Sequence, residues 1–311
     1  MRRLIIIAVS ALIIQVGLIV FLNSATVDYQ PFAPERKLIT FDPSLVDELL
    51  ISGPADEQVR IIREEGSWRL PNLFNAPAES RRVEAVLAKL AAQQKGLAVA
   101  TSSGAWKRFE VADNTFNRRL QLFQDGRMLG DIYIGTAAGF QQSHARVNGE
   151  NSIHTITISG FDLEPESQSW LDRSMLRLAT DDISAVTFDD FELRRDDAGS
   201  FSLAPPHQGE AVVAEQAESL FTTIADLMIE SVADPAFETG TEGAEPALDF
   251  IVKTGEGSTL SYDFIAGEDQ WYILTRSDLP FTFRTYAWIV EELQSFTRHK
   301  LTGEESGARS P

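Results

Sequence analysis

The chain has 311 residues, a formal net charge of −19 at pH 7 and no cysteine. The lack of cysteine excludes a disulfide framework, Cys-ligated zinc, iron–sulfur clusters and thiol catalysis. The strong negative charge repels nucleic acid and anionic lipid headgroups, so nucleic acid is not an expected partner. Hydrophobic residues make up 43% of the chain, enough for one large domain or two modest ones held together by burial.

Residues 1–23 are predicted to form a transmembrane signal anchor. Residues 4–22 are a run of nineteen without a charge. A helix of that length covers about 30 Å, the thickness of the hydrocarbon core of a bilayer. Arg2 and Arg3 precede the run, which orients the N-terminus toward the cytoplasm and the rest of the chain outside it. A cleaved secretory signal is the alternative, but its apolar region is typically shorter, about 7 to 15 residues.

A juxtamembrane linker, residues 24–40, and a first folded domain, residues 41–180, are predicted next. Pro31 and Pro34 favour extended backbone in the linker. The elements expected in the domain are a hairpin turned at Glu65-Gly66, a helix with an apolar stripe on Val83, Val86, Leu87 and Leu90, a hairpin turned at Asp125-Gly126, strands near residues 144–149 and 153–158, and a polar helix over residues 164–178.

The same order of elements is predicted again over residues 181–300. These are a strand at 183–188, a hairpin turned at 197–199, a helix over 214–229 striped by Ala217, Leu220, Phe221, Ile224 and Leu227, a hairpin over 248–265, a strand at 271–274, and a closing helix containing Trp288, Ile289, Leu293 and Phe296. Strands and helices are segregated, which predicts an α+β fold of two similar domains built from antiparallel strands with packed helices. Residues 301–311 are expected to form a disordered tail.

Six segments of the chain are similar to one protein family, number 4340 among the domains of unknown function. They are residues 62–70 with Trp68 after a turn, the proline- and alanine-led helix that begins near Pro77, the hairpin 120–135 ending at Gly135, Ala145-Arg-Val-Asn-Gly, Trp170-Leu-Asp-Arg-Ser, and Asp181-Asp182-Ile183. The resemblance covers roughly Phe41 to Phe296. These motifs specify a fold better than a function, and they bring no active-site residues with them.

The resemblance implies a setting for the protein. Members of this family are bacterial, carry one N-terminal span and often hold tandem copies of the domain. Their genes lie beside ABC-type transport systems like that of gliding motility, whose auxiliary subunit has a large extracytoplasmic region. We therefore expect a single-pass protein of the bacterial inner membrane, anchored in the bilayer by its N-terminal helix, with the bulk of the chain in the periplasm.

The residues that favour metal binding are sparse. The four histidines are scattered, and no pair has a typical ligand spacing, although His144 and His154 are placed to approach each other across a hairpin. Three acidic pairs invite a calcium interpretation because hard cations bind several carboxylates. They do not follow the spacing of a known calcium loop, and solvated turns are the preferred interpretation. These pairs are Asp181-Asp182, Asp189-Asp190 and Asp196-Asp197.

Catalytic motifs are also lacking in the sequence. Neither Ser103 nor Ser159 lies in a Gly-x-Ser-x-Gly segment. Residues 135–139 resemble a small phosphate-binding turn but lack Gly-Lys-Ser/Thr, and a loop after a strand explains them. Paired carboxylates for glycoside hydrolysis have no positive support in an acidic chain that contains many carboxylates. The sequence therefore predicts no catalytic, cofactor-binding or metal-binding residue.

Trp170 and Trp288 lie at comparable places, in the closing helices of the two predicted domains. Packing in the core is the preferred interpretation for both. A role as partner-contact residues is the alternative, because tryptophan is enriched at the energetic centres of protein interfaces.

The leading hypothesis from the sequence is a non-enzymatic interaction or scaffold subunit outside the cytoplasm, accessory to an ABC-type transporter or envelope complex. The alternative is an extracytoplasmic binding protein for a small molecule or glycan, which would use the cleft between the two repeats. A hydrolase ranks third. The sequence does not identify the partner, the ligand or the oligomeric state.

Overall fold

The computed structural model describes residue 15 and residues 36–233, 245–255, 257–267 and 270–303. The predicted anchor apart from Gln15, including Arg2 and Arg3, lies outside these residues, as does most of the predicted linker. Within the described residues, no helix has the length and apolar character needed to cross a membrane.

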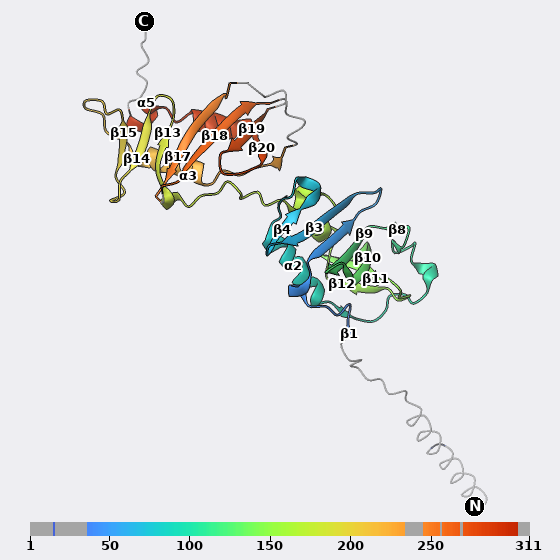
Figure 1. Cartoon of the computed structure of the whole chain (residues 1–311). Helices are drawn as coiled ribbons and strands as arrows, with labels where there is room; N and C mark the ends of the chain where they lie inside the picture. Colours follow the sequence, from blue (N-terminus) through green and yellow to red (C-terminus); the bar gives the residue numbers. More distant parts are fainter. Residues whose placement is uncertain (1–14, 16–35, 234–244, 256, 268–269, 304–311) are drawn as a thin grey trace, which may run out of the picture.

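The fold is α+β, with two eight-stranded antiparallel sheets and few helices, as the sequence predicts (Figure 1). The first sheet has the strand order β12-β11-β10-β9-β2-β3-β4-β5. Its strands are β2 (Glu48–Ser52), β3 (Gln58–Glu64), β4 (Ser67–Leu70), β5 (Ala76–Pro77), β9 (Arg118–Gln124), β10 (Arg127–Gly139), β11 (Gln142–Val147) and β12 (His154–Ile156).

The second sheet has the order β15-β14-β13-β17-β18-β19-β20-β16. Its strands are β13 (Ile183–Thr187), β14 (Glu192–Arg195), β15 (Phe201–Ala204), β16 (Ser231–Val232), β17 (Leu248–Thr254), β18 (Thr259–Ala266), β19 (Trp271–Arg276) and β20 (Thr282–Tyr286). Two further two-stranded sheets pair β1 (Arg36–Lys37) with β6 (Gln94–Lys95) and β7 (Val111–Ala112) with β8 (Thr115–Phe116).

Seven strands of each large sheet follow the same spatial order. The series β4-β3-β2-β9-β10-β11-β12 in the first sheet corresponds to β15-β14-β13-β17-β18-β19-β20 in the second. The eighth strand differs, because β5 extends the first sheet beside β4 whereas β16 extends the second beside β20. One helix precedes the fourth strand of each series in the chain: α2 (Ser80–Ala91) in the first and α3 (Ala214–Ala225) in the second.

The two helices form where the apolar spacing predicts them. In α2 the buried residues are Val83, Val86, Leu87 and Leu90, which share one face of a helix. The same spacing buries Ala217, Leu220, Phe221 and Ile224 in α3. This second helix ends at Ala225, four residues earlier than the sequence predicts, where Asp226 N donates to Thr222 O at 2.9 Å.

The prediction of a polar helix over residues 164–178 is wrong. A short 3-10 helix, η5 (Ser167–Trp170), occupies its first part, and a turn over residues 173–176 precedes the extended chain that follows. The Asp172 carboxylate accepts hydrogen bonds from Ser174 N at 2.9 Å and Ser174 Oγ at 2.6 Å. Asp and Ser side chains that bond nearby backbone in this way compete with helix formation. The extended segment connects the two sheets, which form separate lobes (Figure 1).

Both ends of the folded region extend beyond the predicted limits. Residues 36–40, assigned to the linker from the sequence, are part of the fold, since β1 pairs with β6 and both Leu38 and Ile39 are buried. At the other end, α5 (Arg298–Thr302) buries Leu301, the first residue of the predicted tail. Apolar side chains at both places contribute to the main core.

Strand β10 carries packing on both of its faces. Ile132 and Ile134 join the main core, while Tyr133 between them belongs to a second, smaller core with Val111 and Ile153. Alternate side chains of a strand point to opposite faces of the sheet, which explains this division. The segment 97–117 therefore covers the outer face of the first sheet.

Gly135 lies where that covering segment comes closest to the sheet. A Cβ built at this position would lie 1.8 Å from Phe109 O and 2.7 Å from Glu110 O. Thr136 N also donates to Phe109 O at 3.0 Å, which keeps the two backbones together. Only glycine fits at this position of the strand.

We expect Gly135→Ala to lower the free energy of unfolding by about 3 kcal/mol, because the added methyl group collides with backbone that cannot move without breaking a hydrogen bond. Urea unfolding followed by tryptophan fluorescence measures the change. The matched control is Gly104→Ala, where a Cβ meets nothing within 4 Å. Equal unfolding midpoints for the two variants would contradict this account.

Candidate functional site

The two histidines expected to approach each other lie on opposite faces of the first sheet. His144 is paired in register with Thr155, and His154 with Ala145. Directly paired residues share a face and neighbours along a strand alternate, so the two imidazoles point apart. No group of three or more potential metal ligands occurs among the residues that the structure describes.

Each of these histidines has a structural role. His154 is buried, with Nδ1 3.0 Å from Gly96 O and Nε2 3.0 Å from Ser152 Oγ. The ring of His144 lies 4.6 Å from that of Phe109, and its Nδ1 is 3.0 Å from Thr136 Oγ1. His144 therefore packs against the covering segment on the outer face of the sheet, whereas His154 binds Gly96 and the loop before β12 on the other face.

Two of the acidic pairs lie in loops, Asp189-Asp190 between β13 and β14 and Asp196-Asp197 between β14 and β15, and the third lies in a 3-10 helix before β13. Asp196 Oδ1 accepts hydrogen bonds from Ala198 N at 3.0 Å and Ser200 N at 2.8 Å, which closes the turn between β14 and β15. Asp181 lies in η6 (Thr180–Asp182), 3.8 Å from the Arg195 guanidinium. These contacts agree with the interpretation of the pairs as turn residues.

Residues 135–139 do not form the loop expected from the sequence. They are the last part of β10, with irregular pairing to β11 between Ile134 and Gly139. The backbone groups of a strand are engaged by its neighbours, so the resemblance to a phosphate-binding turn was misleading.

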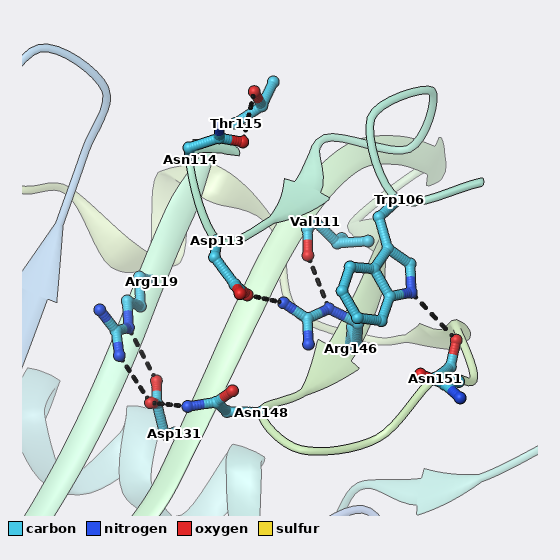
Figure 2. Close-up of polar contacts among 10 residues, drawn as sticks. All are labelled: Trp106, Val111, Asp113, Asn114, Thr115, Arg119, Asp131, Arg146, Asn148 and Asn151. Carbon is cyan, nitrogen blue, oxygen red and sulfur yellow. Dashed lines mark hydrogen bonds and ion pairs between the residues drawn. The ribbon is translucent and has the colours of Figure 1, made fainter. Parts of the chain in front are cut away.

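Arg146, from the segment Ala145-Arg-Val-Asn-Gly, is the centre of a buried cluster on the outer face of the first sheet (Figure 2). Its guanidinium lies 3.9 Å from the centroid of the Trp106 ring and 4.4 Å from that of Tyr133. Arg146 Nε donates to Val111 O at 2.7 Å, and Nη2 donates to Asp113 Oδ1 at 2.5 Å. Only 1% of the Arg146 side chain is exposed.

A second ion pair lies beside this cluster (Figure 2). Arg119 donates to both oxygens of Asp131, at 2.9 and 2.7 Å, and Asn148 Nδ2 donates to Asp131 Oδ2 at 2.7 Å. The hydrogen bond to Asp131 raises the pKa of Arg119, and burial raises the pKa of Tyr133. Paired and stacked charges of this kind hold segments together, so we assign the cluster a structural role.

The two tryptophans named from the sequence differ completely in burial. Trp170 is fully buried, its Nε1 donates to Glu164 O at 2.8 Å, and the Arg82 guanidinium lies 4.6 Å from its ring centroid. Trp288, in α4 (Ala287–Gln294), has 60% of its surface exposed. Trp170 therefore packs in the core, and Trp288 is the residue with surface to offer a partner.

Trp288 lies at the edge of a groove between α3 and α4, which we call the α3–α4 groove. Its volume is about 610 Å³. The apolar side chains that line it are Leu227, Met228, Ile229, Tyr286, Trp288 and Ile289. Leu227, Ile229 and Ile289 are buried and form the floor, whereas Met228 and Tyr286 are exposed, like Trp288.

Carboxylates surround this apolar floor. They are Glu215, Glu218, Asp226, Glu230 and Glu292. Arg173 is the one cation among the described residues that line the groove, and its Nη1 lies 3.1 Å from Glu230 Oε2. Desolvation of the Tyr286 hydroxyl raises its pKa, and a hydrogen bond to Glu230 raises this pKa further. The groove therefore combines exposed apolar surface with a strongly negative rim.

Helix geometry explains how the sequence produces this rim. Glu215 and Glu218 on α3 and Asp226, the C-cap of this helix, are spaced so that they share the helix face opposite the buried stripe. Trp288 and Glu292 lie one turn apart on α4. The sequence analysis named Trp288 but not the acidic row, because exposed carboxylates on a helix ordinarily indicate only a solvated face.

Residues 68–249 match the model of the family described as Domain of unknown function (DUF4340). The chain belongs to this family. The DUF4340 match begins in β4 and ends in β17, so it covers parts of both sheets and includes α3. Trp288 and α4 lie beyond it. No curated protein and no solved structure matches the chain.

The difference in burial between the two tryptophans predicts a large loss of stability when Trp170 is replaced and a small change when Trp288 is replaced. We expect Trp170→Ala to lower the free energy of unfolding by about 3 to 5 kcal/mol, because it leaves a large cavity in the core. Trp288→Ala should change it by about 0.5 kcal/mol or less, as at most exposed positions. Chemical unfolding of both variants beside the wild type checks this, and similar losses would show that Trp288 is part of the core.

Proposed function

We propose that this protein is an extracytoplasmic interaction subunit that holds a partner protein in its α3–α4 groove. The observation that supports this most is the exposure of Trp288, Met228 and Tyr286 around a buried apolar floor. Exposed apolar patches with polar rims are typical of protein interaction sites, and partly exposed tryptophans are common at their energetic centres.

The setting proposed for this subunit is the bacterial inner membrane, as an accessory to an ABC-type transporter or envelope complex. The uncharged run at residues 4–22 behind Arg2 and Arg3 supports the membrane anchor. The transporter setting is what the sequence resemblance to the family implies. In this arrangement residues 1–23 anchor the chain in the bilayer, and both sheets lie in the periplasm. Two lobes with the same strand order suit a scaffold, because each presents its own surface.

A small-molecule or glycan-binding protein is the second candidate. A depression of about 680 Å³ is lined by residues of both lobes, among them Phe74, Asn75 and Arg69 from the first and Phe281 from the second. Aromatic and polar side chains together are typical of ligand sites. A thermal-shift screen of the full chain against sugars and metabolites tests it, and a stabilised condition would favour this candidate.

The interaction proposal predicts that affinity purification of the full-length protein from solubilised membranes recovers a stoichiometric partner. Trp288→Ala should reduce recovery by more than about tenfold, since hot-spot residues contribute at least this much. The matched control is Phe161→Ala, which removes a highly exposed aromatic ring in the first lobe. Quantitative mass spectrometry measures recovery, and equal recovery with both variants would count against the groove.

Replacing residues 1–35 by an unrelated membrane anchor separates two ways of contacting the partner. We expect recovery to survive this replacement, because the proposed contact lies in the second lobe. Loss of the partner would place the contact in the N-terminal segment and contradict the role proposed for the α3–α4 groove.

A further inference from the structure

We infer that the occupant of the α3–α4 groove is an amphipathic helix with basic side chains along its flanks, contributed by the partner protein. This inference rests on the proposed function, which assigns the groove to a protein partner, and it specifies the chemistry of the contacting segment. Three features of the groove support it: its unbalanced charge, its length and its adaptable apolar surface.

The charge of the groove is the first feature. Of its five carboxylates, Glu230 is paired with Arg173, and Asp226 lies 3.4 Å from Arg177. The other three, Glu215, Glu218 and Glu292, take part in no ion pair within the described part of the chain. Lysine or arginine side chains of a partner would meet three unpaired carboxylates around a partly desolvated floor, whereas an acidic segment would be repelled.

The length of the groove is the second feature. Along α3 the lining residues run from Glu215 to Asp226, eleven positions apart. At 1.5 Å per residue this is about 16 Å, or about three turns of a helix lying along the groove. A helix of that length places apolar residues at i, i+3, i+4 and i+7 on one face, which is the pattern of helix-in-groove recognition.

The apolar surface is the third feature. Exposed fractions of 46% for Met228, 39% for Tyr286 and 60% for Trp288 leave apolar surface in contact with water. Leu227, Ile229 and Ile289 below them are buried and fixed. Methionine adapts its shape to different partners, and tryptophan supplies a large contact area from a side chain with few rotatable bonds. Apolar residues of a partner helix would cover these three side chains while its basic residues reach the rim.

The test uses the full chain in nanodiscs of phosphatidylcholine, a zwitterionic lipid without net charge. The probe is a fluorescent peptide of about 14 residues, with leucine at the i, i+3, i+4 and i+7 positions and lysine elsewhere. Fluorescence anisotropy should show saturable binding that weakens when the salt concentration rises from about 50 mM to about 500 mM. A second peptide with the same leucines and glutamate for lysine should not bind. Equal binding of both peptides would overturn the inference.

Substitutions in the protein test whether the lysine peptide binds in the α3–α4 groove. Glu218→Gln with Glu292→Gln, and separately Trp288→Ala, should each weaken binding of the lysine peptide by about tenfold or more. The matched control removes two exposed carboxylates outside the groove, with Glu84→Gln on α2 and Glu291→Gln on α4. Thermal unfolding confirms that all variants are folded. If the groove pair and the control pair weaken binding of the lysine peptide equally, the peptide is attracted by the overall negative charge of the protein. That result would overturn the inference.

The peptide experiment tests the inference and the purification experiment tests the proposed function, so each can be contradicted without the other. If Trp288→Ala abolishes recovery of a partner but the lysine peptide does not bind, the groove is a protein site and the inference about a basic helix is wrong. If the peptide binds in the groove while recovery is unaffected by Trp288→Ala, the chemistry of the groove is as inferred and the proposed function is wrong.

Discussion

A chain without cysteine must stabilise its two large sheets by burial, and each sheet packs against an amphipathic helix that precedes its fourth strand. The helices α2 and α3 direct their apolar stripes into the core and contact β4 and β13 respectively. The opposite face of each helix is then free of core packing. In the second lobe that free face of α3 lies beside α4, and the α3–α4 groove is the direct consequence.

The two lobes share an order of seven strands but close differently after the last of them. In the first lobe, two short 3-10 helices follow β12, and the second of them, η5, turns Trp170 inward, where Glu164 and Arg82 hold its ring. In the second lobe, α4 follows β20 directly and leaves Trp288 largely exposed. The same strand order thus produces a closed core in one lobe and an open apolar groove in the other.

The first lobe also uses its outer sheet face for stability. Residues 97–117 cover that face, held by the stacked guanidinium of Arg146, by the ring contact between His144 and Phe109 and by the close approach at Gly135. Two segments similar to the family, the hairpin that contains Gly135 and Ala145-Arg-Val-Asn-Gly, therefore serve this packing. The motifs that mark the family support its fold, and the groove proposed for binding lies partly outside the matched residues.

The sequence by itself determined the α+β class, the hairpins at Glu65-Gly66 and Asp125-Gly126, and the stripes of α2 and α3, because turn residues and apolar periodicity act over a few neighbouring positions. Only the tertiary structure decided that His144 and His154 point apart, that Trp170 is buried and Trp288 exposed, and that the acids of α3 line one groove with residues of α4. Each of these depends on which distant segment packs against a given face, and local spacing carries no information about that choice. The two tryptophans have comparable places in the sequence, but in the structure Trp170 is a core residue and Trp288 is a candidate contact.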